Sequence, residues 1–512
     1  MRVTTSGGAL RGTPTRRAGC SGVHAFYGVP FAAAPVGAGR FASPVPPAPW
    51  SGVRDASALG VVVPQNPVPA PLDRVFQPRG AQGGDCLNLN VWTPDAGASL
   101  PVLVWIHGGG FQVGSGNEDL YDGSRFARDG VVCVTINYRL GAEGFLHVGD
   151  DTPGSGNYGT LDQIAALRWV SDNIAAFGGD PARVTIAGES SGAMSVAALL
   201  AAPGARGLFR GAILQSGAGH NGLAGSAAAH VAAEVRRRLG VGQGLDALRA
   251  VPVDRVLQVQ GEVAAEVATS SDRERWGPVI DRPWTIPFQP VVGGDVVPDL
   301  PIDAVRRGRV ADIPLLVGYC AEEYRLHLGA ASEFFTVDED VVAALYGAVF
   351  GDHASAARAL YAETAGADPT SLVAAIQTDR QYRVPAIRLA AAQAAVGGRA
   401  WLYRHARRSS AFGGTIGAGH ATELPYVFDL LDDDTSALLA GVDAPQQLAD
   451  VMHAAWVRFV SDGDPSGPSL TWPMVDATCP TMVFDDSSGV AYAPDAATLR
   501  WYDDLPERLL GV

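Results

Sequence analysis

The sequence contains no lysine, so all 38 of its basic residues are arginine, and 53 acidic residues give a net charge of −15 at neutral pH. A surface with this excess of negative charge repels nucleic acid and anionic membranes. We therefore exclude nucleic-acid binding and expect no membrane partner. The absence of lysine and the abundance of alanine, glycine and valine are typical of a high-GC bacterial genome.

Cysteine is scarce as well. The five cysteines are scattered through the chain, and no two of them are spaced as Cys-x-x-Cys; they are Cys20, Cys86, Cys133, Cys320 and Cys479. Zinc sites and disulfide frameworks need closer and more regular spacing. We therefore expect no metal, no organic cofactor and no disulfide framework.

Long apolar runs and linkers are also missing. No apolar run reaches the roughly 18 residues that span a bilayer, and the first residues lack the hydrophobic core of a signal peptide, so we expect a cytoplasmic protein. No tract rich in Ser, Gly, Pro or one charge separates the two halves. The sequence thus predicts a single domain over residues 1–512, with a helix-rich, lid-like insertion around 330–395.

What the sequence does contain is a strand, a tight turn and a helix around one serine. Residues 183–187 read as a β-strand, residues 188–192 are Gly-Glu-Ser-Ser-Gly, and residues 194–200 read as a helix. In this context the serine of Gly-x-Ser-x-Gly sits on a sharp turn, because glycines two residues away on either side let strand and helix approach closely. Ser190 is therefore the candidate nucleophile.

A second motif lies upstream. The strand-like residues 102–106 lead directly into residues 107–111, His-Gly-Gly-Gly-Phe. Consecutive glycines bring backbone N–H groups close to a ligand in conformations that a Cβ atom would forbid. In an acyl-transfer site such donors form an oxyanion hole with the N–H of the residue after the nucleophile, so the candidates are Gly109, Gly110 and Ser191.

These two motifs belong to a longer pattern. Together with residues 85–92 (Asp-Cys-Leu-Asn-Leu-Asn-Val-Trp), 137–141 (Asn-Tyr-Arg-Leu-Gly) and 177–181 (Phe-Gly-Gly-Asp-Pro), they resemble the type-B carboxylesterase family over essentially the whole chain. This family includes cholinesterases and bacterial broad-specificity esterases. The resemblance implies an α/β-hydrolase fold: an α/β protein with a mostly parallel central sheet, helices on both faces and helical insertions over the cleft.

The resemblance also bears on the cysteines. Relatives that leave the cell often pair a cysteine at the place of Cys86 with one earlier in the chain. Val63 stands at the matching place here. This departure fits a reducing compartment.

A serine hydroxyl needs a base, and the candidate base is His420. In hydrolases of this fold the histidine follows the nucleophile and the acid in chain order. The segment around His420 resembles the family's His-Gly-x-Glu-Leu-Pro-Phe-Val-Phe, with Ala421 in place of the glycine and Tyr426 in place of a phenylalanine. The rival, His107, lies beside the glycine triplet, where wall packing is the expected role.

The candidate acid is Glu323 rather than its neighbour Glu322. The family pattern places the acid five residues after a glycine, and counting from Gly318 reaches Glu323. Adjacent side chains on an extended segment also face opposite sides, so only one of the two can turn toward His420. Ser216, at the end of a further strand, lacks the glycine two residues before it and is expected to be structural.

The remaining pattern predicts alternating strands and helices. Residues 1–30 should form an antiparallel edge of the main sheet. We expect strands at 88–92, 102–106, 131–137, 183–187, 211–217, 313–319 and 400–405, and helices at about 161–174 and 446–460. Strands that alternate with helices predict a parallel sheet with crossover connections.

The function that follows is that of a serine carboxylesterase, which hydrolyses a small-molecule carboxylic ester through an acyl-enzyme with a Ser-His-Glu triad and a backbone oxyanion hole. A lipase or an amidase would share the same residues. A non-catalytic, cholinesterase-like interaction module is the alternative from another class; Ser190, Glu323 and His420 are all present, which favours an enzyme. The protein is expected to be a monomer or a homodimer.

Overall fold

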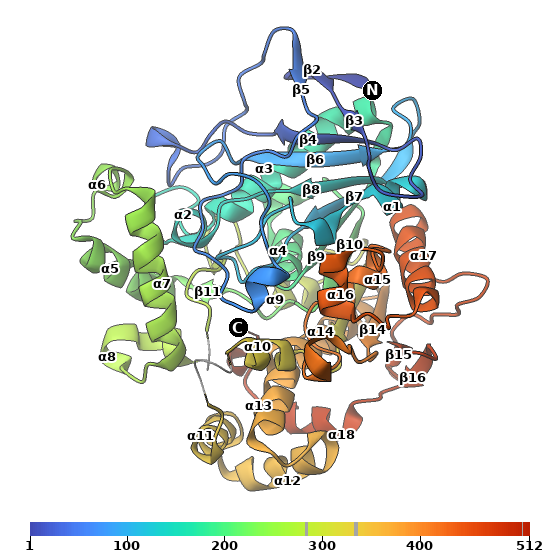
Figure 1. The fold of residues 1–512 in the computed structure, drawn as a ribbon. Helices are drawn as coiled ribbons and strands as arrows, with labels where there is room; N and C mark the ends of the chain where they lie inside the picture. Colours follow the sequence, from blue (N-terminus) through green and yellow to red (C-terminus); the bar gives the residue numbers. More distant parts are fainter. Residues whose placement is uncertain (282–284, 332–335, 504, 512) are drawn as a thin grey trace.

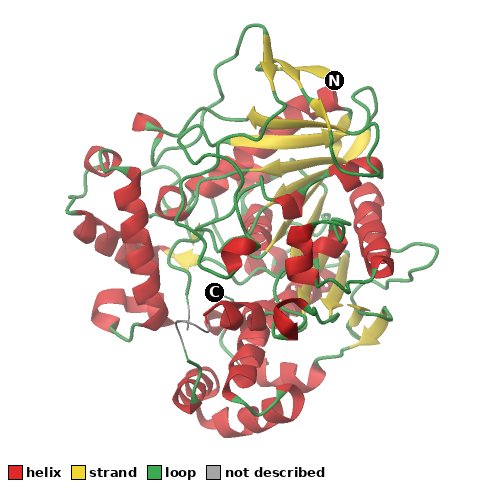
Figure 2. Ribbon diagram, viewed as in Figure 1, coloured by secondary structure: helices red, strands yellow, loops and turns green. Residues whose placement is uncertain are grey.

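The computed structural model describes residues 1–281, 285–331, 336–503 and 505–511. Its centre is a large mixed sheet surrounded by helices (Figures 1 and 2). The strands are β1 (Arg2–Thr5), β2 (Gly8–Arg11), β3 (Thr13–Pro14), β4 (His24–Pro30), β5 (Val53–Asp55), β6 (Asn88–Thr93), β7 (Leu100–Ile106), β8 (Val132–Ile136), β9 (Gly179–Glu189), β10 (Gly211–Gln215), β11 (Leu223–Ala224), β12 (Val291–Val292), β13 (Leu315–Cys320), β14 (Ala400–His405), β15 (Pro480–Phe484) and β16 (Gly489–Tyr492).

The order of strands in the main sheet is β16-β15-β14-β13-β10-β9-β7-β8-β6-β4-β3. All neighbours from β15 to β8 are parallel, whereas β16 at one edge and β6, β4 and β3 at the other are antiparallel. The expected α/β class with a mostly parallel sheet is confirmed.

The N-terminal edge differs in part from the expectation. The strands β3 and β4 do extend the main sheet. The hairpin of β1 and β2 instead pairs with β5 in a small separate sheet, so the expected antiparallel edge is right for β3 and β4 and wrong for β1 and β2. The cause is local, because the Ser6–Gly7 turn pairs β1 with β2 and the loop that contains Trp50 returns alongside.

Helices pack on both faces of the sheet. They are α1 (Ser124–Arg128), α2 (Gly141–Phe145), α3 (Tyr158–Asn173), α4 (Ser191–Ala201), α5 (Gly225–Leu239), α6 (Leu245–Arg249), α7 (Val253–Thr269), α8 (Arg273–Trp276), α9 (Pro301–Arg306), α10 (Tyr324–Ala331), α11 (Glu339–Phe350), α12 (Ala354–Ala365), α13 (Pro369–Thr378), α14 (Val384–Ala395), α15 (Leu424–Val427), α16 (Asp434–Ala440), α17 (Gln446–Asp462) and α18 (Ala496–Leu499). A π-helical turn, Asp379–Arg383, joins α13 to α14.

The alternation of side chains along the strands divides the core into two layers. In β7, Val102, Val104 and Ile106 belong to the apolar cluster that includes α3, α4 and α14, whereas Leu103 and Trp105 belong to the cluster on the opposite face, with α1 and α17. Because both faces are covered, the parallel strands read as continuous apolar runs.

The helix-rich segment after Glu323 forms its own apolar cluster. Helices α11, α12 and α13 pack against the C-terminal residues around Tyr502, below the sheet in Figure 1. Of the lid-like insertion expected at 330–395, residues 332–335 lie outside the described residues. The single-domain organisation and the role of this segment as a lid stay predictions.

The sheet brings several chain segments to one edge. Strand β7 ends at Ile106 before the glycine triplet, β9 ends at Glu189 before Ser190, and β13 ends at Cys320 before the Glu322–Glu323 pair. Because these strands are parallel, their carboxyl ends meet on the same side, which is where open α/β sheets bind ligands.

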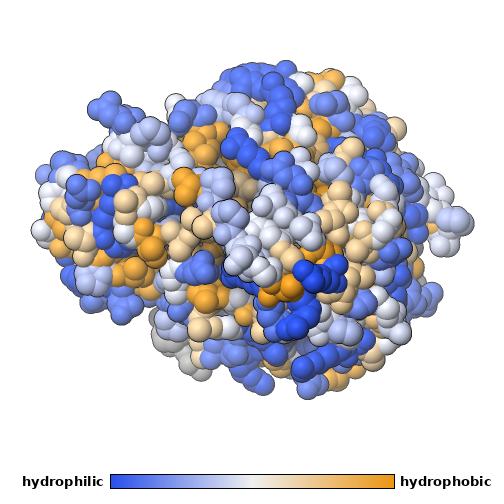
Figure 3. Space-filling view, turned by 90° about the horizontal axis from the view of Figure 1, so that it is seen from above, coloured by the Kyte–Doolittle hydropathy of each residue, from blue (hydrophilic) through white to orange (hydrophobic). Residues whose placement is uncertain are grey.

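Within the described ranges, no helix is both long and apolar enough to cross a bilayer. The same residues hold no group of three or more His, Cys, Asp or Glu side chains arranged to bind a metal. The view from above in Figure 3 shows hydrophilic and hydrophobic residues interspersed over that face.

Candidate active site

Ser190 occupies the sharp turn that the sequence predicts. It joins β9 to α4 with φ 58° and ψ −129°, a conformation that is strained for a residue with a side chain. Its N–H donates a 2.9 Å hydrogen bond to the carbonyl of Gln215 at the end of β10. The turn is therefore fixed by the neighbouring strand as well as by its own two flanks.

The glycines of the motif are required by close approach. A Cβ atom on Gly192 would lie 2.0 Å from the carbonyl oxygen of Ile106, and a Cβ atom on Gly188 would lie 2.4 Å from the carbonyl carbon of Gly192. Neither contact is possible without moving the backbone of β7 or α4. The two glycines thus let the end of β7 touch the start of α4 beside Ser190.

The glycine triplet lies against the same turn. A Cβ atom on Gly108 would lie 3.1 Å from Cβ of Ser190, and one on Gly109 would lie 2.1 Å from the carbonyl oxygen of Val113. Gly109, Gly110 and Ser191 line the same cavity as Ser190. The structure therefore brings together the three residues proposed from sequence as oxyanion donors.

His420 and Glu323 are directly paired. His420 Nδ1 hydrogen-bonds Glu323 Oε2 at 2.6 Å, and the backbone N–H of His420 donates to the carbonyl of Glu323 at 3.1 Å. The other carboxyl oxygen, Oε1, accepts a 2.7 Å bond from the N–H of Cys320. Both side chains are buried, and His420 lines the cavity with Ser190.

Burial sets the charge of this pair. It lowers the pKa of His420 to about 4, against the opposing charge of Glu423. Burial also raises the pKa of Glu323 to about 8, although the Cys320 N–H, the Ser216 hydroxyl and the Arg383 charge all act to lower it. Burial thus favours the neutral imidazole of His420, which can accept a proton.

The three rivals named from the sequence lie elsewhere. Glu322 turns away from His420: it accepts the N–H of Ala418 at 3.0 Å and pairs with Arg325 at 2.7 Å. These partners, with Arg408, outweigh the effect of burial and lower the pKa of Glu322.

His107 is fully buried and stacks on Tyr138 with ring centroids 4.6 Å apart, and its Nδ1 hydrogen-bonds the carbonyl of Gly108 at 2.8 Å. Burial lowers its pKa to about 4. Ser216 lies behind Glu323, and its N–H donates to the carbonyl of Gly318 at 2.9 Å. Both residues thus have the wall and support positions expected from the sequence.

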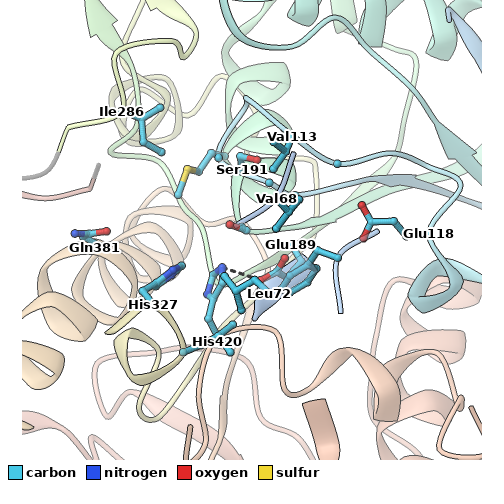
Figure 4. Close-up of a pocket in the computed structure, with 18 of the residues that line it drawn as sticks. Val68, Leu72, Val113, Glu118, Glu189, Ser191, Ile286, His327, Gln381 and His420 are labelled. Carbon is cyan, nitrogen blue, oxygen red and sulfur yellow. Dashed lines mark ion pairs between the residues drawn. The ribbon is translucent and has the colours of Figure 1, made fainter. Parts of the chain in front are cut away.

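Sequence reasoning missed two buried carboxyl groups that line the cavity, Glu118 and Glu189. His420 Nε2 lies 3.0 Å from Glu189 Oε1, the contact drawn in Figure 4. Burial, with the charges of Glu423, Glu323 and Glu118, raises the pKa of Glu189 well above its usual value. Burial raises the pKa of Glu118 to about 8, so Glu118 favours the uncharged form at neutral pH. Glu189 could have been noticed as the residue before the nucleophile.

Sequence reasoning also missed His327 and Tyr382, whose ring centroids lie 4.8 Å and 4.9 Å from the ring centroid of His420. Both line the cavity. His327 follows Glu323 by four residues, which is one helical turn, so this spacing could have indicated its position. Nothing in the sequence relates Tyr382 to them.

The cavity has a volume of about 330 Å³. Much of its wall is apolar, with side chains contributed by Val68, Leu72, Phe76, Met194, Ile286 and Leu326. Among the residues that the structure describes, no arginine lines it. Such a cavity suits an uncharged organic molecule. Figure 4 shows Val68, Leu72 and Ile286 among the side chains that line it.

Known proteins have the same fold and similar sequences. The model of the Carboxylesterase family matches residues 1–488. The chain is 38% identical over 513 residues to the para-nitrobenzyl esterase of Bacillus subtilis, with 96% of each protein covered. It is 36% identical over 497 residues to phenmedipham hydrolase of Pseudarthrobacter oxydans, covering 94% of this chain and 95% of that protein.

Solved structures agree. A carboxylesterase of Geobacillus stearothermophilus, solved at pH 6.2, superposes with a TM-score of 0.84 at 36% identity, covering 98% of this chain and 100% of that one. A thermophilic PNB esterase gives 0.82 at 33% identity, with 98% and 99% covered. The fold is therefore the α/β-hydrolase fold, and its class is that of the carboxylic ester hydrolases. The chain belongs to the carboxylesterase family, as the resemblance implied.

Proposed function

We propose that Ser190, His420 and Glu323 are the catalytic triad of this esterase and that the N–H groups of Gly109, Gly110 and Ser191 form its oxyanion hole. The observation that carries the proposal is the 2.6 Å hydrogen bond between His420 and Glu323, in the same cavity as the strained Ser190. In this arrangement the carboxylate of Glu323 accepts a hydrogen bond from Nδ1–H, which holds the imidazole in the tautomer whose Nε2 carries no proton and can act as the base.

The chemistry follows from these positions. Ser190 Oγ attacks the ester carbonyl while His420 Nε2 takes its proton, and the backbone N–H groups stabilise the negative oxygen. The bond to the alcohol oxygen then breaks, and His420 gives the proton to the departing alcohol. Water attacks the acyl-enzyme with His420 again as base, which releases the acid and restores Ser190.

We further propose that the substrates are uncharged esters. Glu118 and Glu189 face the cavity without an arginine nearby among the described lining residues. A carboxylate on the substrate would find no positively charged partner there, and an unpaired charge in a buried site is costly. No cofactor takes part in the scheme.

The place of the protein in the cell is a separate proposal. We propose a cytoplasmic, bacterial location, in which cysteines stay reduced. In support, Cys86 is buried with an unpaired thiol, and Val63 stands where relatives that leave the cell often have the cysteine that pairs with it. Titration of denatured, unreduced protein should find all five thiols; a lower count would contradict this proposal. The choice between monomer and homodimer stays a prediction.

Ser190→Ala should abolish hydrolysis of p-nitrophenyl butyrate and leave the circular dichroism spectrum unchanged, because only one exposed oxygen is lost. An organophosphate should add once to the wild type, on the peptide that contains Ser190, as mass spectrometry would show.

The wild type should also hydrolyse p-nitrophenyl butyrate faster than the charged p-nitrophenyl hemisuccinate. Retained activity in the variant, or an adduct elsewhere, would overturn the assignment; equal rates on the two esters would contradict the substrate class.

Glu323→Gln should lower kcat by about 10³- to 10⁴-fold, because the amide cannot stabilise the imidazolium and favours the wrong tautomer. Glu322→Gln is the matched control, since that side chain bonds Ala418 and two arginines instead of His420. Its kcat should be nearly that of the wild type. The reverse ranking in a steady-state assay would show that Glu322 is the acid.

The pH profile provides an independent check. The base must be unprotonated, and burial lowers the pKa of His420 to about 4, so protonation should inactivate the enzyme only well below the pKa of an exposed histidine. We expect kcat/KM to stay constant as the pH falls from neutral to about 6, and to decrease only below that value. Circular dichroism at each pH would exclude unfolding. An acid limb centred near the ordinary histidine pKa of roughly 6.5 would be incompatible with a desolvated base.

A further inference from the structure

His420 lies on a loop and not on a helix or strand, so its ring needs contacts to hold it. The Glu323 hydrogen bond fixes Nδ1, but the ring can still turn about that bond. Its Nε2 then has two neighbouring partners, because Glu189 and Ser190 are adjacent in the chain and both line the cavity. In the structure Nε2 lies 3.0 Å from Glu189 Oε1. A contact that limits the rotation of the His420 ring would therefore affect the rate of catalysis.

Two rings meet the imidazole from the helical segment beyond Glu323. The ring of His327, on α10, lies 4.8 Å from the ring of His420 at 41°, and that of Tyr382, in the π-helical turn, lies 4.9 Å away at 47°. These two residues are also bonded to each other, since His327 Nε2 and Tyr382 Oη are 3.1 Å apart. Figure 4 shows His327 beside His420 on the cavity wall.

The position of Tyr382 is unusual for its backbone. π-Helical turns are rare and frequently occur at functional sites. The turn Asp379–Arg383 interrupts what would otherwise be a continuous helix from α13 to α14, and it brings Tyr382 into the cavity wall. Tyr324 supports the arrangement from the other side, with its ring 4.9 Å from that of His327.

We infer that His327 and Tyr382 form a hydrogen-bonded positioning unit, which limits the rotation of the His420 imidazole about its bond to Glu323 and so keeps Nε2 available to Ser190. The inference rests on the proposed triad. Neither residue needs to touch the substrate or exchange a proton with it; both act through His420.

The charge state of the pair is compatible with this role. Burial and the nearby His420 lower the pKa of His327 to about 3, and burial raises the pKa of Tyr382 well above its usual value. Both are uncharged at neutral pH. They therefore do not repel the imidazolium that forms when His420 accepts the serine proton.

A double-mutant cycle tests the inference. His327→Phe and Tyr382→Phe each keep a ring and remove one end of the hydrogen bond. Each should lower kcat by about 5- to 10-fold, the factor that corresponds to one net hydrogen bond, while KM stays nearly constant. The double variant should be no slower than either single variant, because the shared bond is already lost. The rate of serine phosphorylation by an organophosphate should fall by the same factor, since it uses the same base.

Tyr346→Phe is the matched control. Tyr346, on α11, also donates a buried hydrogen bond, from its hydroxyl to the carbonyl of Leu372 at 3.1 Å, and it does not line the cavity. It should lower the melting temperature without changing kcat. If Tyr382→Phe behaves in the same way, or if the two single effects add in the double variant, the inference is wrong. A rise in KM at unchanged kcat would also overturn it, because it would indicate substrate binding.

A second pair of variants covers the case in which His327→Phe does not fold. His327→Gln keeps a hydrogen-bonding group for Tyr382, whereas His327→Leu has similar bulk and none. The glutamine variant should keep a several-fold higher kcat than the leucine variant; equal values would contradict the inference. Ser190→Ala and His420→Ala in the same assay distinguish failure of the proposed triad from failure of the positioning unit. Activity in either variant contradicts the triad. If both are inactive but the effects in the double-mutant cycle add, only the positioning unit is rejected.

Discussion

The contact on which the site depends is between two backbones: the carbonyl of Ile106, at the end of β7, and Gly192, in the first turn of α4. An added Cβ atom would lie 2.0 Å from that oxygen. This approach fixes where the glycine triplet leaves β7 relative to the start of α4, and Ser190 lies between them in its strained conformation. Because the strain is held by β7, β10 and α4 together, the serine is presented by a buried part of the sheet.

A second constraint is the burial of four carboxyl groups: Glu118 and Glu189 line the cavity, and Glu323 and Glu423 lie outside its lining. Four negative charges this close in a dry interior would be very unfavourable. Burial acts against the simultaneous ionisation of all four, because it raises the pKa of each group. In the proposed scheme, the site gains charge when His420 takes up a proton beside the carboxyl group of Glu323.

Much of this could be predicted from the sequence because its signals are local. The strand–turn–helix at Ser190 and the glycine triplet at 108–110 are contiguous, and the strand predicted at 400–405 coincides with β14. The family and the ester-hydrolase class are confirmed by the comparisons. The choice of Glu323 over Glu322 needed only the register of one segment, and the structure places Glu323, and not Glu322, at His420.

What the sequence could not predict depends on distant segments. Sequence reasoning did not recognise the strands β15 and β16. It assigned β1 and β2 to the wrong sheet, because sequence alone does not say which strand pairs with which. The wall around His420 is the clearest case. His327 and Tyr382 are separated in the chain by three helices, α11, α12 and α13, and they meet only because a π-helical turn redirects the chain before α14.

This wall also shows how the helical segment can influence chemistry that the sheet presents. The sheet fixes the serine and the acid through strands β9 and β13, whereas the imidazole between them is carried by a loop and contacted by rings from α10 and the π-helical turn. Rigid backbone thus defines two members of the site, and side-chain packing defines the third. In the proposed scheme this third member alternates between accepting and donating a proton. On that scheme, the parts of the chain that pack against it are where turnover can vary while the fold and its nucleophile stay the same.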